Sequence, residues 1–391
     1  MPARRPHRLA GAPRRTPAMA PARARAGQRG IALLIVLLLV LIIAPFAEHY
    51  ARQVGLEART ARNVVDQLAI ENAIDGQFEL VLARLEQDAT EDDVDSLYDT
   101  MFDEGIQERQ EKDTEVSLST RVFDEQGKFN VLNLVRAPAG ERRELMRQRL
   151  VRILMLARQD SKEALDETQA RELVDDAADF LGGKKGRGQI PKPSTTDNRG
   201  FLMLEDLAFA NAKWGPLLVD QRDAEDVAPG LSRYLTVYGS GRVNLNTADV
   251  VVLKAFFPGD ETVAERIVER REGETEEEAS GTGSAAKEED AEGEGDSGNP
   301  FTDVNQVNQV EGVTPLLLQK EKVELAADFD VRSAFWSMRI MAETQSTRRE
   351  ELYVVERVKA PQQGNQAPSL EGFRHLLHQE RTDALEDLTQ E

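Results

Sequence analysis

The chain has 391 residues, enough for two or three domains, and no cysteine, which excludes disulfides, thiolate metal sites and a cysteine nucleophile. Its formal net charge is −21, from 49 basic and 70 acidic residues. Residues 1–29 carry eight arginines and no acid, so the remainder has 41 basic and 70 acidic residues, a net charge of −29. A body this acidic repels nucleic acid and anionic lipid headgroups, which argues against both as ligands.

The N-terminal segment RGIALLIVLLLVLIIAPFAEHYARQ, residues 29–53, indicates a membrane anchor. After Gly30, seventeen uncharged and mostly apolar residues run from Ile31 to Ala47. The run exceeds a signal-peptide core, and a cut after Ala47 would place Pro45 at the −3 position, which is unfavourable. It is near the lower limit of about 17–25 residues for a spanning helix. We therefore predict a retained single-pass anchor with its basic end in the cytoplasm.

The segment after the anchor is expected to stay helical to about Asp88, because it contains no proline and only two glycines, Gly55 and Gly76. Five apolar residues with helical spacing predict one buried face: Ile70, Ile74, Phe78, Val81 and Leu85. We predict one long helix, with its first third in the membrane, a kink at Pro45 and its second half packed on a soluble domain. The alternative is a plain anchor followed by an unrelated helix.

The body alternates between strand and helix patterns. Residues 116–135 predict a β-hairpin with its turn at 125–128, and residues 335–344 and 351–358 predict two more strands. Helical periodicity occupies the region between them, notably at 145–156 and 165–180. The sequence thus predicts an α+β fold: a small antiparallel sheet packed on the long helix, with an all-helical domain inserted between sheet strands.

Residues 241–273 predict two helices joined by a tight turn at Pro258-Gly259. Asn246 and Thr247 are expected to cap the first helix. This pattern resembles a helix-hairpin-helix unit, which in DNA-binding proteins offers backbone N–H groups and nearby cations to phosphates. Here the hairpin carries two acids, Asp260 and Glu261, where cations would lie. DNA binding is therefore disfavoured.

Three other segments show no binding or catalytic motif. Residues 182–200 are rich in Gly, Pro and basic residues but lack phosphate-loop spacing, so we expect a surface loop. Residues 272–298 carry eleven acids and one lysine, lack the calcium-loop spacing and are expected to be disordered. The tail 361–391 is expected to end in a polar helix, on which His375 and His378 form a solvated face more readily than a metal pair. No catalytic set is recognisable, which argues against an enzyme.

A basic leader that ends in Gly30, followed by an apolar helix that continues as an amphipathic helix, resembles the type IV pilin-like prepilins. The resemblance implies that a prepilin peptidase cuts between Gly30 and Ile31 and that Ile31 is then N-methylated. Most members have Glu at mature position five, where this chain has Ile35. That departure is typical of minor pseudopilin K of type II secretion systems. Met19 would open a twelve-residue leader, and we expect it to be the true start.

Two further motifs extend the resemblance to the minor pseudopilin K (general secretion pathway protein K) family over roughly residues 29–360. The family motif V-N-x-N-T-A is matched by Val243, Asn244, Asn246, Thr247 and Ala248. The pattern N-R-x-F-x-x-x-E-x-L is matched by Asn198, Arg199, Phe201, Glu205 and Leu207. The family's aromatic and acid-rich stretch near residue 180 is degenerate here, which puts any function of that loop in doubt.

The resemblance implies a pilin-like fold with an inserted all-α domain that contains the helix-hairpin-helix (SAM-like) unit. The expected segments are a leader 1–30, a transmembrane half-helix 31–50, an amphipathic helix and first pilin-like part 51–135, the inserted domain 136–325, returning strands 326–360 and a tail 361–391.

The implied function is a minor pseudopilin at the tip of the type II secretion pseudopilus, which initiates or caps filament assembly for protein export. It would lie in the inner membrane, with its bulk in the periplasm. Its implied partners are minor pseudopilins I and J, the prepilin peptidase and the inner membrane, without nucleic acid. No cofactor is required, and Ca²⁺ is implied by the resemblance alone, without mapped ligands. The alternatives are a membrane-anchored helix-hairpin-helix DNA receptor of the competence type and an anchored periplasmic domain of unrelated role.

Overall fold

The computed structural model describes residues 28–91, 94–99, 109–110, 116–159, 161, 164–183, 203–223, 226–273, 298–344, 347–359 and 370–384. The chain divides into two compact units, residues 1–64 and residues 65–391, which are described separately.

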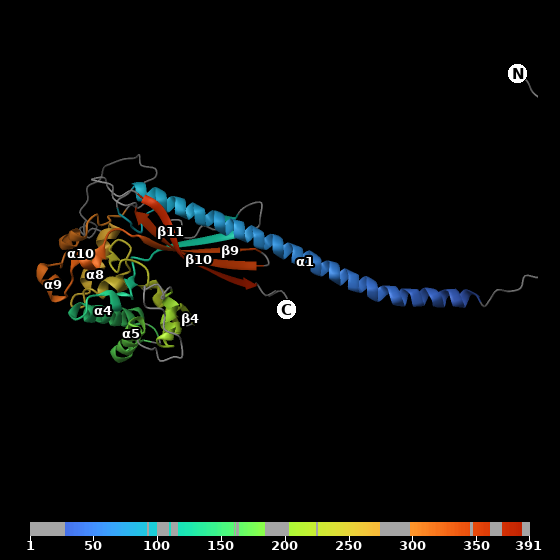
Figure 1. Ribbon diagram of the computed structural model, residues 1–391, viewed down its shortest axis with the longest axis horizontal. Helices are drawn as coiled ribbons and strands as arrows, with labels where there is room; N and C mark the ends of the chain where they lie inside the picture. Colours follow the sequence, from blue (N-terminus) through green and yellow to red (C-terminus); the bar gives the residue numbers. More distant parts are fainter. Residues whose placement is uncertain are drawn as a thin grey trace, which may run out of the picture. The chain divides into compact units, whose positions relative to one another are not determined.

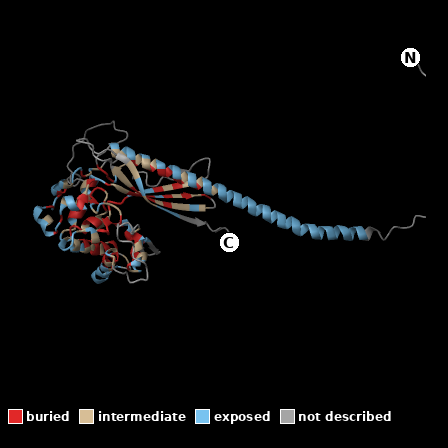
Figure 2. Ribbon diagram, in the orientation of Figure 1, coloured by how far each residue is buried: buried red, intermediate tan, exposed pale blue. Residues whose placement is uncertain are grey.

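Helix α1 runs from Gln28 to Glu91 and is continuous through Pro45 (Figure 1). In the first unit, residues 31–64 are all exposed (Figure 2). This is the one helix among the described residues that is long and apolar enough to cross a membrane, with a mean hydropathy of 2.9 in its most apolar window. The prediction of one long N-terminal helix is confirmed.

The second unit contains a five-stranded antiparallel sheet in the order β1-β2-β9-β10-β11. Figure 1 labels three of its strands, β9, β10 and β11. Its strands are β1 Arg109–Gln110, β2 Ser117–Asp124, β9 Phe335–Glu343, β10 Thr347–Lys359 and β11 Leu370–Ala384. The predicted buried face of α1 forms one apolar core with the sheet, chiefly with Trp336, Met338, Ile340, Tyr353 and Val355. Each fully buried Ile, Leu or Val side chain there stabilises the fold by about 1.5–3 kcal/mol relative to exposure.

The chain between β2 and β9 forms a mainly helical insert. Its α-helices are α3 Asn133–Arg136, α4 Glu141–Ala157, α5 Glu167–Leu181, α6 Trp214–Leu218, α7 Val250–Lys254, α8 Thr262–Glu272, α9 Pro315–Lys320 and α10 Leu325–Asp328. Among the described residues of the insert, the 3-10 helices are η1 Leu204–Phe209, η2 Leu231–Arg233 and η4 Val304–Gln309. Short strand pairs join β3 Phe129–Asn130 to β6 Leu235–Thr236, β4 Gln221–Asp223 to β5 Asp226–Ala228, and β7 Val243–Asn244 to β8 Phe329–Asp330.

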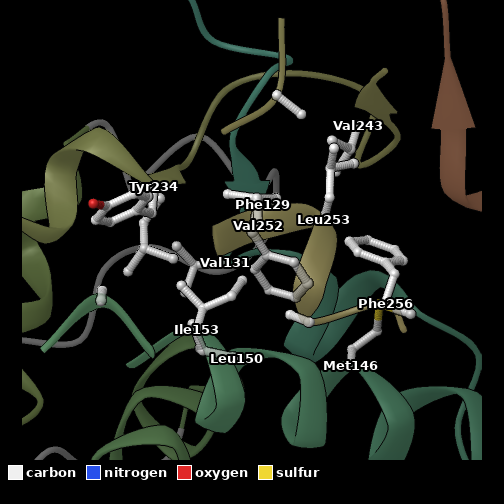
Figure 3. Packing of buried hydrophobic residues seen from close by; sticks show 14 of the residues in the cluster. Phe129, Val131, Met146, Leu150, Ile153, Tyr234, Val243, Val252, Leu253 and Phe256 are labelled. Atoms are coloured by element: carbon white, nitrogen blue, oxygen red, sulfur yellow. The ribbon is translucent and has the colours of Figure 1, made fainter. Parts of the chain in front are cut away.

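The insert has its own apolar core, in which side chains from α4, α7 and the β3 segment converge (Figure 3). Phe129, Ile153 and Val252 are fully buried in it. The predicted α+β fold class, with a long helix, a small antiparallel sheet and a helical region inserted between sheet strands, is therefore confirmed.

The first strand of the hairpin predicted at 116–135 is present as β2, but the prediction that the segment after the turn pairs with it is wrong. Strand β3 pairs in parallel with β6 rather than with β2. Phe129 N donates to Tyr234 O at 2.8 Å and Val131 N donates to Thr236 O at 2.9 Å. Because Phe129 and Val131 are fully buried in the insert's core, their burial there outweighs the local tendency to pair with β2.

The predicted helix cap at Asn246 and Thr247 is also wrong. Helix α7 begins at Val250, and Asp249 is its N-cap, with a side chain that accepts from Val251 N at 2.9 Å. The helix is short and ends at Lys254. Asn246 and Thr247 instead make the longer-range contacts described below.

The predicted polar helix in the tail is wrong, because residues 370–384 form strand β11, which pairs with β10 along its whole length. A register shift leaves Leu376 unpaired, so His375 and His378 lie on one face although they are three residues apart. His375 packs edge-on against Phe78, and His378 stacks on Tyr353. Long-range strand pairing thus outweighs the weak local helical pattern.

Candidate functional site

The V-N-x-N-T-A segment lies where the helical insert joins the sheet. Val243 and Asn244 form β7, which pairs with β8 immediately before the chain returns to the sheet. Val243 and Ala248 are buried in the insert's core, and Asn244 and Asn246 are 0% and 1% exposed. The motif is therefore an internal connection rather than a surface feature.

Asn244 connects three chain segments through its side-chain amide. Its Nδ2 donates to Asp95 O at 3.1 Å, to Asp124 Oδ2 at 3.2 Å and to Ser333 Oγ at 2.8 Å. These acceptors lie after α1, at the end of β2 and just before β9. Its Oδ1 accepts from Asn246 N at 2.9 Å. A single asparagine thus satisfies polar groups on both sides of the junction.

The other polar residues of the motif also make buried contacts. Asn246 exchanges two hydrogen bonds with the Phe301 backbone, because its Nδ2 donates to the carbonyl at 3.0 Å and its Oδ1 accepts from the N–H at 2.7 Å. Thr247 Oγ1 donates to Asp124 Oδ2 at 2.5 Å. A Cβ on Gly127 would lie 2.8 Å from Thr247 Oγ1, so this approach requires glycine. We call Asp95, Asp124, Asn244, Thr247 and Ser333 the junction cluster.

Two buried carboxylates lie in the junction cluster. Asp124 also accepts from Gln126 N at 2.7 Å and Ser333 Oγ at 2.5 Å, but burial outweighs these bonds and raises its pKa to about 6. Asp95 accepts from Ser333 N at 2.6 Å and from Arg357 Nη2 at 2.9 Å. Burial likewise raises the pKa of Asp95, against the opposing effect of Arg357. Ionising the carboxyl groups of Asp124 and Asp95 at neutral pH therefore costs folding free energy.

We expect the free energy of unfolding to depend on pH through Asp124. Its pKa is raised on folding, so its contribution is complete below the unfolded value of about 3.8 and is lost as pH rises through about 6. Asp124→Asn should remove this dependence. Relative to the variant, the wild type should lose about 3 kcal/mol between pH 3.5 and pH 7 in denaturant titrations at matched pH. A difference between the two proteins that does not change with pH would contradict this.

One group of three carboxylates is a candidate Ca²⁺ site. Among the described residues, Asp88, Asp95 and Asp99 bring carboxylate oxygens within 4.8 Å of one another. Arg357 Nη2, however, lies 2.9 Å from Asp95 Oδ1 and 3.6 Å from Asp88 Oδ2. Asp99 accepts from Ser96 N at 2.8 Å. A guanidinium already supplies the cation, so these residues do not fit the six to eight oxygen ligands of Ca²⁺.

The predicted helix-hairpin-helix unit is present, with α7 and α8 joined through Pro258 and Gly259. Its acidic residue Glu261 pairs with Arg152 of α4. Lys254 pairs with Glu265 at 2.6 Å. A Cβ on Gly259 would meet Glu321 Oε1 at 2.3 Å, so a carboxylate lies against the hairpin. Lys320 Nζ would lie 2.8 Å from the same Cβ, so acidic and basic side chains both surround the hairpin. The acids pair with the cations that a phosphate would need, which disfavours nucleic acid.

The predicted processing residues lie at the start of α1. Gly30 is within the helix, and Ile31 and Ile35 are 63% and 54% exposed. The leader through residue 27 lies outside the described residues, as do Asn198, Arg199 and Phe201 of the second motif. Leu207 of that motif is fully buried in η1. The loop 184–200 and most of the acidic segment 272–298 also lie outside the described residues.

Sequence reasoning missed an exposed apolar stripe on α1. Small and apolar residues recur at alternating spacings of four and three, and all of them are exposed: Ala47, Ala51, Val54, Ala58 and Ala61. The spacing continues in the sequence at Val65 and Leu68. A 3.5-residue repeat is the signature of a helix that packs against another helix, and alanine allows close approach. We call the five residues from Ala47 to Ala61 the alanine stripe.

Comparison with known proteins shows a remote structural likeness. The chain matches no protein-family model and no curated protein. Among solved structures, it resembles a chain in the crystal structure of the GspK-GspI-GspJ complex from the enterotoxigenic Escherichia coli type 2 secretion system. The TM-score is 0.49 at 17% sequence identity, and the match covers 83% of this chain and 99% of the other. A likeness this remote does not assign the chain to a family.

Proposed function

We propose that this protein is a minor pseudopilin of a type II secretion system. The observation that carries the proposal is the part of helix α1 that lies in the first compact unit. This part exposes an apolar run long enough to span a membrane, and it also exposes the alanine stripe. Exposed apolar surface of this extent marks a region that is buried in lipid or against another protein. The prepilin-like leader and the V-N-x-N-T-A motif in the sequence support the same assignment.

In this proposal, a prepilin peptidase cuts between Gly30 and Ile31, and the new amino group of Ile31 is methylated. The apolar run holds the protein in the inner membrane before assembly, with the basic leader in the cytoplasm and the bulk of the chain in the periplasm. Ile35 lacks the carboxylate that most pilin-like subunits offer to the amino terminus of a neighbouring subunit. A subunit without this contact suits the tip of a filament.

The partners in this proposal are minor pseudopilins I and J, as in the complex named above. The alanine stripe would pack against one of their parallel helices. The V-N-x-N-T-A residues have an internal role, because their side chains hold the bulky insert on the sheet. An insert fixed in this way would leave no room for a further subunit above it, which would cap the filament. No cofactor is needed for such a role.

The alanine stripe provides the test. Ala58→Glu places a carboxylate in the proposed seam, and we expect recovery of both partners with the full-length protein from detergent-solubilised membranes to fall about ten-fold or more. The matched control is Thr60→Glu, two residues and about 200° away on the same exposed helix. It should leave recovery within about two-fold of the wild type. Equal recovery with both variants would contradict the proposed seam.

A further inference from the structure

The face of the sheet turned away from α1 carries rows of cross-strand neighbours. One row contains Arg121, Arg339, Leu352 and Gln379, and the next contains Phe123, Ser337, Val354 and Leu377. On the other side of the arginine row, Ser119 is opposite Met341. We call the surface formed by Arg121, Phe123, Arg339, Met341 and Leu352 the outer face.

Two arginines are directly opposite each other on the outer face. Arg121 and Arg339 are paired across β2 and β9, and both are exposed. Arg339 Nε lies 3.0 Å from Glu350 Oε1. Arg121 has no ion pair or hydrogen bond from its side chain to any of the described residues. Like charges in directly opposed positions destabilise a sheet, and among the described residues only Arg339 of the two has a counter-ion.

The surroundings of the arginine pair resemble an interaction surface. Phe123 is 38% exposed beside the pair, and Met341 and Leu352 are half-buried. The charged strand residues on this side of the sheet whose side chains the structure describes are Arg121, Arg339, Arg348, Arg374, Glu343, Glu350 and Glu356. They give a local surplus of one positive charge in a chain of net charge −21. Arginine next to aromatic and other apolar side chains is the typical composition of a protein interface.

We propose that the outer face docks a neighbouring pilin-like subunit through an aspartate or glutamate of that subunit, which Arg121 and Arg339 bind together. A carboxylate placed between the two guanidinium groups would remove their repulsion and gain charge-assisted hydrogen bonds. Apolar side chains beside it would pack on Phe123 and Met341. This inference rests on the proposed function, since it takes the partner to be a subunit of the same filament.

The test uses the full-length protein co-expressed with minor pseudopilins I and J. We expect the double variant Arg121→Glu/Arg339→Glu to lower recovery of one partner about ten-fold or more, because a like charge would then face the partner's carboxylate. The milder Arg121→Gln should lower it less and keep the fold, as checked by thermal unfolding. The matched control is Arg348→Glu, another exposed arginine on the same side of the sheet, which should leave recovery unchanged.

A photo-crosslinking residue in place of Phe123 identifies what contacts the outer face. A cross-link to a partner segment that contains Asp or Glu is the expected result. A cross-link only to this chain's own acidic residues 274–297, or normal assembly of the folded double variant, would overturn the inference and leave the proposed function intact. Failure of the wild-type protein to assemble with either partner would overturn both.

Discussion

Asp328→Ala should lower the free energy of unfolding by about 3–5 kcal/mol, the usual cost of leaving a buried charge without its partner. Asp328 Oδ1 accepts from Arg149 Nη1 at 2.5 Å and from Arg142 Nη2 at 2.5 Å. Arg149 and Asp328 have only 2% of their side-chain surface exposed, and the guanidinium of Arg149 also lies over the Phe256 ring. The variant leaves this cation buried in the core of the insert.

Denaturant unfolding of the purified full-length protein measures this cost. The control is Asp175→Ala, which removes the exposed pair between Arg147 and Asp175, whose side chains are 32% and 64% exposed. Exposed pairs contribute little, so we expect a change within about 0.5 kcal/mol. A similar loss of stability in the two variants would show that the buried ion pair does not hold α4 to α10, the helix before β8.

Asn244→Ala should lower the free energy of unfolding by about 2–4 kcal/mol, because it removes a donor from three buried acceptors and an acceptor from Asn246 N. The variant should also loosen the structure locally, around the contacts that Asn244 makes. We expect faster amide hydrogen exchange at Ser333, whose N–H donates to Asp95 and whose hydroxyl accepts from Asn244. Exchange at buried β10 residues such as Val355 should change less.

The control for Asn244 is Asn305→Ala. Asn305 lies in η4, and its exposed side chain bonds only to Asp303 among the described residues. We expect this variant to be nearly as stable as the wild type, within about 0.5 kcal/mol. An Asn244→Ala protein with wild-type stability and unchanged exchange at Ser333 would show that the motif does not hold the insert on the sheet.

The parts of the fold that could be predicted from the sequence are those fixed by strong local periodicity. The buried face of α1 from Ile70 to Leu85 repeats at helical spacing, and the even-numbered residues of β9 alternate into the same core. The helix-hairpin-helix unit was recognisable because Pro258-Gly259 separates two short apolar patterns. In each case, neighbouring residues in the chain carry the whole signal.

The errors occurred where distant residues decide the structure. Phe129 pairs with a segment more than a hundred residues away, and only that pairing buries it. The polar sequence of β11 becomes a strand because β10 offers a partner, with a register shift that no local pattern reveals. The V-N-x-N-T-A motif was recognised, but the roles of Asn244 and Asn246 depend on Ser333 and Phe301, which are far along the chain.

The alanine stripe was also missed, for a different reason. Alanine contributes little to an apolar pattern, so the repeat from Ala47 to Ala61 is weak in the sequence. It becomes informative only when the structure places every one of its residues on exposed helix. Its spacing of four and three could have been counted from the sequence alone.

The central claim is that the chain is a pilin-like subunit processed at Gly30, and the mass and amino-terminal sequence of the membrane-extracted protein test it most directly. The protein should be isolated from cells with and without prepilin peptidase. We predict a mature chain that begins at N-methylated Ile31 only when the peptidase is present. A leader that stays intact in both strains, or a cut near Ala47, would contradict the account and leave an anchored or secreted domain without a place in the filament.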